Sequence, residues 1–289
     1  MNTKIAKVVF KDIRNIEKDV ADCLNLLNPK VREDVLIKPN LVQGAPPGKS
    51  ISTNVYVINA VIKWLKRYGI HKIRIADGSG AINTAKEFEK ARYDLLNIPF
   101  VDLNHDSYAN VKISNALEWP SIEVAKTFYN ASYVINMAVA KCHHITGATL
   151  GIKNLMGVLR PLGKDNAKDH IHKEWTYSDM PRKNAKELFE RRLIDLLRIR
   201  NIDLTIIDGT YSLELYESSH DVVKTNFIIA SDDIIAADML CAKIMGFEPD
   251  EVYHIKLAQQ ILGERRLIVA GDKPRFFNFK KSPLWLEAK

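Results

Sequence analysis

The segment 141–154 (KCHHITGATLGIKN) gathers side chains that can hold an anion, move a proton or bind a metal. It contains two histidines, one cysteine and two lysines, with too little apolar periodicity for a core element. Gly147 and Gly151 let the backbone approach a ligand closely or adopt a positive φ. Backbone N–H groups, together with Lys153, would then form a concave anion site. The alternative is a structural turn with a buried Lys–Asp pair.

Histidines occur as two pairs within residues 142–172, and they are candidates for metal binding or acid–base chemistry. With one cysteine, the candidate ligands are Cys142, His143, His144, His170 and His172. No spacing among them matches a zinc finger or a His-Glu-x-x-His motif. A neutral imidazole also exchanges protons near pH 7. The pattern leaves open a metal site, an acid–base site and, for His144 and His172, surface positions without a role.

Other reactive side chains come directly after apolar runs that predict buried strands. They are Lys38 and Asn40 after 35–37, Asp77 and Ser79 after 73–76, Asn136, Lys141 and His143 after 133–135, and Asp208 after 204–207. In an open α/β sheet, ligands bind outside the carboxyl ends of the strands. We therefore expect these side chains to meet the 141–154 segment at one edge of the sheet.

Helical patterns alternate with these strands. Asn54 can cap a helix that ends near Gly69, a polar helix is expected near 84–92, and Asn184 opens a capping box for another. Further helices are expected after Ser231 and from Pro249 to about Gly263, with strands at 227–230 and 268–269 and a long loop before Asn184. Strand–helix–strand spacing of this kind predicts right-handed βαβ units.

The expected fold is therefore α/β, a layered, mainly parallel sheet with helices on both faces. Residues 1–271 would form a single domain, or two intimate lobes at about 1–130 and 131–271, and residues 272–289 a C-terminal tail.

Composition limits the classes of protein to consider. The 289 residues are 46% hydrophobic and 27% charged, which is ordinary for a globular protein and excludes a disordered chain. No apolar run is long enough to span a membrane, and the N-terminal residues have no signal-type apolar core. Three scattered cysteines argue against a disulfide framework. We expect a cytoplasmic protein without a membrane partner.

The net charge of +7 would suit a protein that binds nucleic acid, but no run of Lys and Arg residues is as dense as in a basic nucleic-acid-binding arm. The tail mixes Arg275, Phe276, Phe277, Phe279, Lys280 and Lys281. Such a mixture could stack on bases. We favour instead a tail that latches onto the body of the protein or onto a second copy in a homo-oligomer.

Six segments resemble, in order, the domain-of-unknown-function 362 family. They are 35–42 (VLIKPNLV), 75–80, 133–136 with Lys141 and His143, 146–157 (TGATLGIKNLMG), 203–209 with Glu214, and 231–246. Members of that family are sometimes fused to a ferredoxin-like domain that binds two four-iron clusters. This chain lacks the cysteine runs for such clusters, so none is expected. The family's Gly-Pro-rich stretch after the acidic residue is replaced here by 215–221 (LYESSHD).

A more distant likeness is to the nickel-pincer lactate racemases. His143, Gly147, Gly151 and Lys153 are similar to their cofactor-binding stretch, with the lysine ten residues after the histidine, and His170 follows. The resemblance implies that Lys153 anchors a metal-containing cofactor, that His170 ligates the metal and that His143 is an acid or base. The arginine-bearing substrate motif of the racemases is missing at 77–80.

These observations lead to an enzyme that acts on a small anionic substrate, with a metal ion or metal-containing cofactor as a further expectation. Catalysis is assigned to His143, Lys141 and Lys153, and metal binding to His170 and His143. The expected binding residues are Lys38, Asn40, Asp77, Ser79, Gly147, Thr149, Gly151, Lys153 and Asn154. The alternatives are a non-enzymatic binding protein for nucleic acid or a metallocofactor, and a scaffold whose partner performs the chemistry.

Overall fold

A central sheet organises the protein, and its strands are joined mainly in parallel. The computed structural model describes residues 3–49, 51–81, 83–163 and 167–289. The strand order is β12 (Arg265–Gly271), β1 (Lys4–Asp12), β11 (Phe227–Ser231), β9 (Leu204–Leu213), β7 (Tyr133–His143), β2 (Asp34–Lys38), β3 (Lys72–Asp77) and β4 (Phe100–Asp102). Only β11 runs antiparallel to its neighbours along this path, within the described residues. The prediction of a layered, mainly parallel α/β fold is confirmed.

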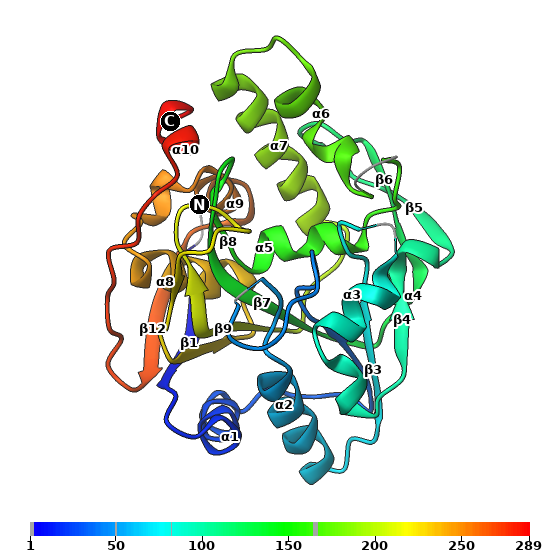
Figure 1. Cartoon of the computed structure of the whole chain (residues 1–289), viewed down its shortest axis with the longest axis vertical. Helices are drawn as coiled ribbons and strands as arrows, with labels where there is room; N and C mark the ends of the chain where they lie inside the picture. The colour runs from blue at the N-terminus through cyan, green and yellow to red at the C-terminus, as the bar shows by residue number, and fades with distance from the viewer. Residues whose placement is uncertain (1–2, 50, 82, 164–166) are drawn as a thin grey trace.

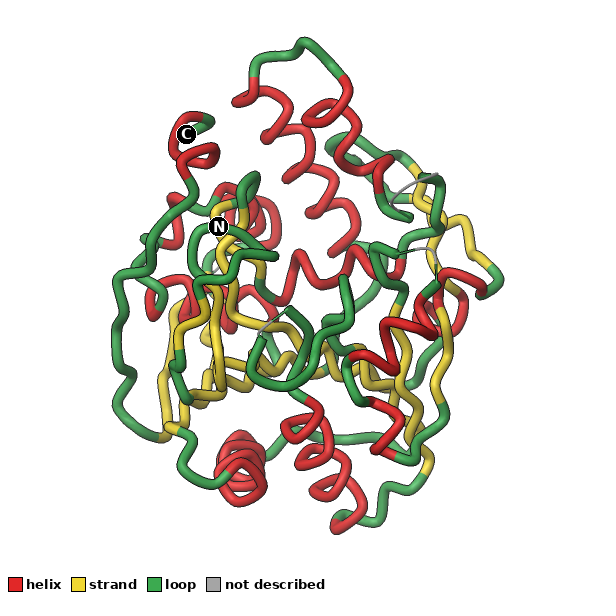
Figure 2. The backbone as a smooth tube through the Cα atoms, in the orientation of Figure 1, coloured by secondary structure: helices red, strands yellow, loops and turns green. Residues whose placement is uncertain are grey.

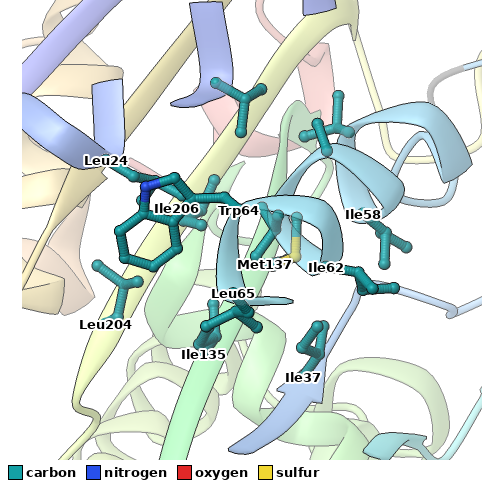
Figure 3. Close-up of a cluster of buried hydrophobic side chains, with 14 of the residues drawn as sticks. Leu24, Ile37, Ile58, Ile62, Trp64, Leu65, Ile135, Met137, Leu204 and Ile206 are labelled. Carbon is teal, nitrogen blue, oxygen red and sulfur yellow. The ribbon is translucent and has the colours of Figure 1, made fainter. Parts of the chain in front are cut away.

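Helices cover both faces of the sheet (Figure 1 and Figure 2). One face carries α1 (Ile16–Leu27) and α2 (Val55–Arg67), which share a hydrophobic cluster with alternate side chains of the central strands. Figure 3 shows Trp64, Ile62 and Leu65 of α2 in this cluster, together with strand residues such as Ile37 and Ile135. The other face carries α7 (Arg182–Leu197), α8 (Ile234–Ile244) and α9 (Tyr253–Leu262).

The apolar runs form strands because both of their faces are covered. In β2, Val35 and Ile37 belong to the cluster under α1 and α2, whereas Leu36 belongs to the cluster on the opposite face. Because both faces of such a strand are buried, its sequence lacks the alternation of apolar and polar residues that is typical of a half-exposed strand. It ends where the charged Lys38 begins the cluster of polar side chains described below.

Smaller elements complete the chain. The helices and short 3-10 turns are α3 (Thr84–Lys90), η1 (Tyr93–Leu96), η2 (Leu103–His105), α4 (Lys126–Tyr129), α5 (Gly151–Asn154), η3 (Leu155–Val158), α6 (Asp169–Tyr177), η4 (Pro249–Glu251) and α10 (Pro283–Glu287). The β5–β6 hairpin (Tyr108–Lys112 and Ser121–Ala125) forms a separate sheet, while β8 (Gly147–Thr149) pairs with β7 and β10 (Val222–Val223) pairs with β9.

Two local expectations are wrong. The long loop expected before Asn184 contains the rest of β7, then β8, α5 and α6, because its polar residues find buried partners. The expected capping box at Asn184 is absent, since α7 begins at Arg182 with Pro181 as its N-cap residue. Strand β1 and helix α1 were not foreseen, although Asn15 caps α1 by accepting a hydrogen bond from the Lys18 amide.

The C-terminal tail packs against the body of the same chain. Phe279 and Trp285 are buried, with 3% and 0% of their surface exposed, and are not available to stack on bases, whereas Phe276 is 66% exposed. The tail's contribution to an oligomer remains a prediction. Cys23, Cys142 and Cys241 are all buried and free. Within the described ranges, every helix is too short or too polar to cross a lipid bilayer.

Candidate functional site

A cavity of about 230 Å³ opens at the carboxyl ends of β2, β3 and β7. Its walls come from those strand ends, from α5 and α6, and from the segment after β9. The polar and charged residues of this lining include Lys38, Asp77, His143, Lys153, Lys168, His172 and Glu217. The sequence-based expectation that several strand ends meet at one site agrees with this arrangement.

A buried ion pair forms one wall of the cavity. Nζ of Lys38 lies 2.7 Å from Oδ1 of Asp77, at the ends of the adjacent strands β2 and β3. The backbone amides of Leu41 and Gly78 also donate to the Asp77 carboxylate, at 2.8 and 2.9 Å. Burial lowers the pKa of Lys38 and raises the pKa of Asp77, and each charge opposes that effect on the other. The two charges therefore depend on each other to remain ionised away from water.

A chain of amide side chains links this wall to β7 and α5. Lys141 Nζ donates to Asn40 Oδ1 at 2.9 Å and to the Ile51 carbonyl at 2.8 Å. Asn40 in turn donates to Asn154 Oδ1 at 3.0 Å, and Asn154 donates to Asn136 Oδ1 at 2.7 Å. Burial, and after it the charge of Lys153, lowers the pKa of Lys141 to about 7. Lys141 thus lies behind the lining and orients Asn40 and Asn154, which line the cavity.

Lys153 is a cation without a fixed partner. It projects from α5 to the cavity and makes no hydrogen bond or ion pair with any residue that the structure describes. Its Nζ lies 5.8 Å from the centre of the Phe189 ring. Burial lowers the pKa of Lys153 to about 8, although the Glu217 carboxylate opposes this. An anion bound beside Lys153 would supply a direct counter-charge, which Glu217 provides only at longer range.

Glu217 joins two histidines at the mouth of the cavity. One carboxylate oxygen lies 3.4 Å from His143 Nε2 and the other lies 3.1 Å from His144 Nδ1. The two imidazole rings stack with their centres 4.7 Å apart. Burial would raise the pKa of Glu217, but the hydrogen bond with the His144 ring and the charge of the Lys153 ammonium outweigh it and hold that pKa below its usual range. Glu217 is therefore an anion in the folded protein.

Glu217 escaped prediction because it lies in 215–221, the stretch that replaces the family's Gly-Pro-rich segment. Nothing in its spacing connects it with His143, which is 74 residues earlier in the chain. Lys168 was also missed, because its spacing does not connect it with the other residues of the site. Its Nζ donates to Asn104 Oδ1 at 2.7 Å, and burial lowers its pKa to about 7. A signal for Lys168 was its position two residues before His170, in a segment rich in charge.

The expected anion cradle at Gly151 is already filled by the protein. The amides of Gly151 and Ile152, at the start of α5, donate to the two carboxylate oxygens of Asp238 at 2.7 and 2.9 Å. Asp238 is fully buried on α8. Because an internal carboxylate takes these amides, they are unavailable to a ligand, and the cradle expectation is wrong for Gly151.

Four other predicted residues lie outside the cavity lining. Gly147 has φ +79° and packs against the Trp285 ring, so its role is to shape the turn between β7 and β8. Thr149 Oγ1 donates to the Lys141 carbonyl at 3.5 Å, and Ser79 Oγ donates to the Ala81 carbonyl at 2.7 Å. Asp208 accepts from the amides of Asn54 and Thr210. All four support the backbone in this arrangement.

His170 and His172 point to different places although both belong to α6. His172 lines the cavity, whereas His170 lines a separate hollow and stacks on Trp119 with ring centres 5.9 Å apart. Burial lowers the pKa of His172 to about 3 and that of His170 to about 4, so both rings are neutral. The structure does not bring His170 together with His143, the partner expected for a shared metal.

Comparisons with known proteins agree with the fold. A family model described as Domain of unknown function (DUF362) matches residues 35–243. The chain is 27% identical over 260 residues to Thylakoid-associated protein sll1697 of Synechocystis sp. (strain ATCC 27184 / PCC 6803 / Kazusa), covering 88% of this chain and 75% of that protein. It is also similar to the structure of the lactate racemase apoprotein from Thermoanaerobacterium thermosaccharolyticum, with a TM-score of 0.52 and 15% identity. That likeness covers 83% of this chain but 57% of the racemase chain, and it shows a shared fold.

Proposed function

Because this chain belongs to the DUF362 family, which is described only as a domain of unknown function, we propose from its own cavity that it is an enzyme acting on a small anionic substrate. The substrate would bind at the carboxyl ends of β2, β3 and β7. A cavity of about 230 Å³ suits a molecule of a few carbon atoms better than a nucleotide or a polymer. Lactate, the substrate class in the racemase's name, is of that size.

The observation that carries this proposal is Lys153. A half-buried ammonium group that forms no direct ion pair is costly, because the Glu217 carboxylate only partly offsets its removal from water, and the lowered pKa of Lys153 expresses that cost. A bound carboxylate or phosphate would remove it. Lys38 is unavailable for this purpose because Asp77 already neutralises it.

Lys153 is also the group best suited to move a proton. A general acid or base works best when its pKa lies near the working pH, and burial brings the pKa of Lys153 to about 8. The ε-amine can reach substrate atoms because it is not committed to a protein partner. Lys141, the other lysine expected to be catalytic, is proposed to act through Asn40 and Asn154, as a positioning residue.

A metal-containing cofactor was expected from the racemase likeness, and the residues fit it poorly. Lys153 faces the cavity, as an anchoring lysine should, but His170 lines a different hollow together with Trp119. The ring nitrogen of His143 that does not face Glu217 already accepts hydrogen bonds from the backbone. The proposed reaction therefore uses no step through a metal. Elemental analysis of protein purified without oxygen tests that choice.

Calorimetric titration with inorganic phosphate, lactate and other small carboxylates tests the proposal. We expect at least one of these anions to bind wild-type protein and Lys243→Met, a control at an exposed position on α8, and to bind Lys153→Met at least tenfold more weakly. Turnover is followed by NMR as the exchange of substrate C–H for deuterium in D₂O. Equal binding by Lys153→Met and wild type would remove the proposed anion site, whereas binding without exchange or product would indicate a binding protein.

The cytoplasmic localisation remains a prediction. The relative from Synechocystis is described as thylakoid-associated.

A further inference from the structure

The side chain of His143 is fixed by the turn that follows it. The backbone amides of Ile145 and Thr146 both donate to His143 Nδ1, at 3.0 and 3.2 Å. A ring nitrogen that accepts two N–H groups must present its lone pair to them and cannot carry a proton. In the neutral ring, the proton is therefore on Nε2.

The turn that supplies these amides is itself held in place. Gly147 adopts φ +79°, and a Cβ there would come within 2.7 Å of the Trp285 ring. Pairing of Cys142 with Ala148 and of His143 with Gly147 closes β7 onto β8 on either side of the turn. Trp285 is fully buried. Because Gly147 and the buried Trp285 ring fix the conformation of the turn, the two amides are held in position to donate to the imidazole.

The surroundings of Nε2 keep the ring neutral and point it at the cavity. Nε2 lies 3.4 Å from Glu217 Oε1, which is long for a hydrogen bond, and His143 lines the cavity. Burial lowers the pKa of His143 well below 6.5, and the charge of Lys153 acts in the same direction, while Glu217 opposes them. A second proton would have to sit on Nδ1, facing the two backbone N–H groups.

We propose that His143 is a fixed hydrogen-bond donor, whose neutral imidazole gives its Nε2–H to an uncharged oxygen of the bound molecule. This inference rests on the proposed function and deepens it. Glu217 places a negative charge beside Nε2, so a second anionic oxygen is disfavoured there, whereas a carbonyl or hydroxyl oxygen is accepted. The anionic group of the same molecule then lies at Lys153. A neutral imidazole can polarise a carbonyl in this way without transferring a proton itself.

The proposed donor role differs from both roles expected from the sequence. A proton carrier must change its protonation state, which the two amides prevent. A metal ligand must present a lone pair from Nε2, which then requires the proton on Nδ1. Although donor atoms of His143, His144 and Glu217 lie within 4.8 Å of one another, the tautomer of His143 is the wrong one for coordination.

Nitrogen NMR on protein without added ligand tests the tautomer directly. Long-range ¹H–¹⁵N spectra of ¹⁵N-histidine protein are recorded from pH 5 to pH 9, with His143 assigned through its backbone resonances. We expect an Nε2–H pattern that does not change over this range. A proton on Nδ1, or a ring that titrates between pH 5 and pH 8, overturns the proposal. So does a Zn²⁺ titration in which one equivalent shifts both ring nitrogens of His143.

Two substitutions test the contact with the bound molecule. The amide nitrogen of glutamine in His143→Gln can take the place of Nε2–H, whereas asparagine in His143→Asn reaches only the position of Nδ1. We expect His143→Gln to bind the best anion from the titration within about threefold of wild type, and His143→Asn to lose more than tenfold. Equal losses in the two folded variants overturn the donor role. If wild type binds no anion, the proposed function fails, yet the NMR result still decides the tautomer.

Discussion

Lys38 and Asp77 form an ion pair of 2.7 Å whose side chains are 0% and 3% exposed, between the ends of two adjacent parallel strands. Gly157 lies against the pair so closely that a Cβ there would come within 2.1 Å of Asp77 Oδ1. The pair and the glycine together form a polar wall of the cavity that leaves no room for a further side chain. The charges in this wall are balanced before any ligand binds.

Removing one member of the pair should be costly. Asp77→Asn leaves the Lys38 ammonium buried without a counter-charge, so we expect the free energy of unfolding to fall by about 3–5 kcal/mol in urea denaturation. The control is Asp34→Asn, which breaks the more exposed contacts of Asp34 with Lys72 and Arg74 and should cost about 1 kcal/mol or less. A cost for Asp77→Asn no larger than the control's would contradict the buried pair.

The close approach of Gly157 gives a second prediction. Gly157→Ala must displace the Asp77 carboxylate, and we expect it to reduce both stability and anion binding. Gly69→Ala is a matched control, because Gly69 has φ +78° and no neighbour within 4 Å. That control should cost only the roughly 1–2 kcal/mol of a left-handed alanine. Chemical denaturation and calorimetry of both variants decide whether the extra loss at Gly157 exists.

Anion affinity should depend on pH through Lys153. The protonated ammonium attracts the anion, and the pKa of Lys153 without ligand is about 8. The association constant should therefore change little below pH 7 and fall about tenfold for each pH unit above 8. Lys153→Arg, which remains charged, should remove this decline, whereas Lys243→Met should keep it. A wild-type affinity that is flat from pH 7 to pH 10 would disagree with the assignment.

Lys141 should make stability rise with pH. Its pKa is about 7 in the folded protein, against an ordinary value of 10.5, so the unfolded chain holds more protons between those values. Stability then increases with pH over this range, by up to about 1.4 kcal/mol per pH unit. Subtracting the unfolding free energy of Lys141→Met from that of wild type isolates this contribution. The difference should grow from pH 7 to pH 10, and no such growth is expected for Lys243→Met.

Trp285 should stabilise the protein and the turn before β8. Trp285→Ala empties a fully buried site beside Gly147, and we expect a loss of about 3–5 kcal/mol. The amide resonances of Ile145 and Thr146 should shift in the same variant. Leu286, the next residue, is 52% exposed, and Leu286→Ala should change stability by about 0.5 kcal/mol at most. Similar losses in the two variants would show that the tail is not anchored as described.

The sequence predicted the parallel part of the sheet because β2, β3 and β9 each contain a mainly apolar stretch that is followed by a charged residue, Lys38, Asp77 and Asp208 respectively. It failed for β1, in which Lys4, Lys7 and Lys11 interrupt the apolar residues of a strand beside the edge strand β12. It also failed for the second half of β7, where Lys141 and His143 look like loop residues. Their burial depends on Asn40, Ile51 and the amides after His143, which no local pattern contains.

The candidate site was predicted in part. Lys38, Asn40, Asp77, His143, Lys153 and Asn154 all line the cavity, the first four at or just after strand ends and the last two on α5. The ligand-binding role predicted for Gly151 is wrong. Its amide binds Asp238 instead, and this partner lies 87 residues later in the chain. Glu217 was missed because only the fold brings it to His143. Contacts over such distances cannot be read from spacing.

The position of β1 has a consequence for how the chain reaches its final form. This strand precedes the other strands of the sheet in the chain, yet its partners are β11 and β12, and Lys4 is opposite Arg265. During synthesis β1 must remain unpaired until most of the chain has left the ribosome. Pairing over such sequence separations is slow. The first strand is therefore among the last to find its place, and until then the edge of β11 is exposed to pairing with other chains.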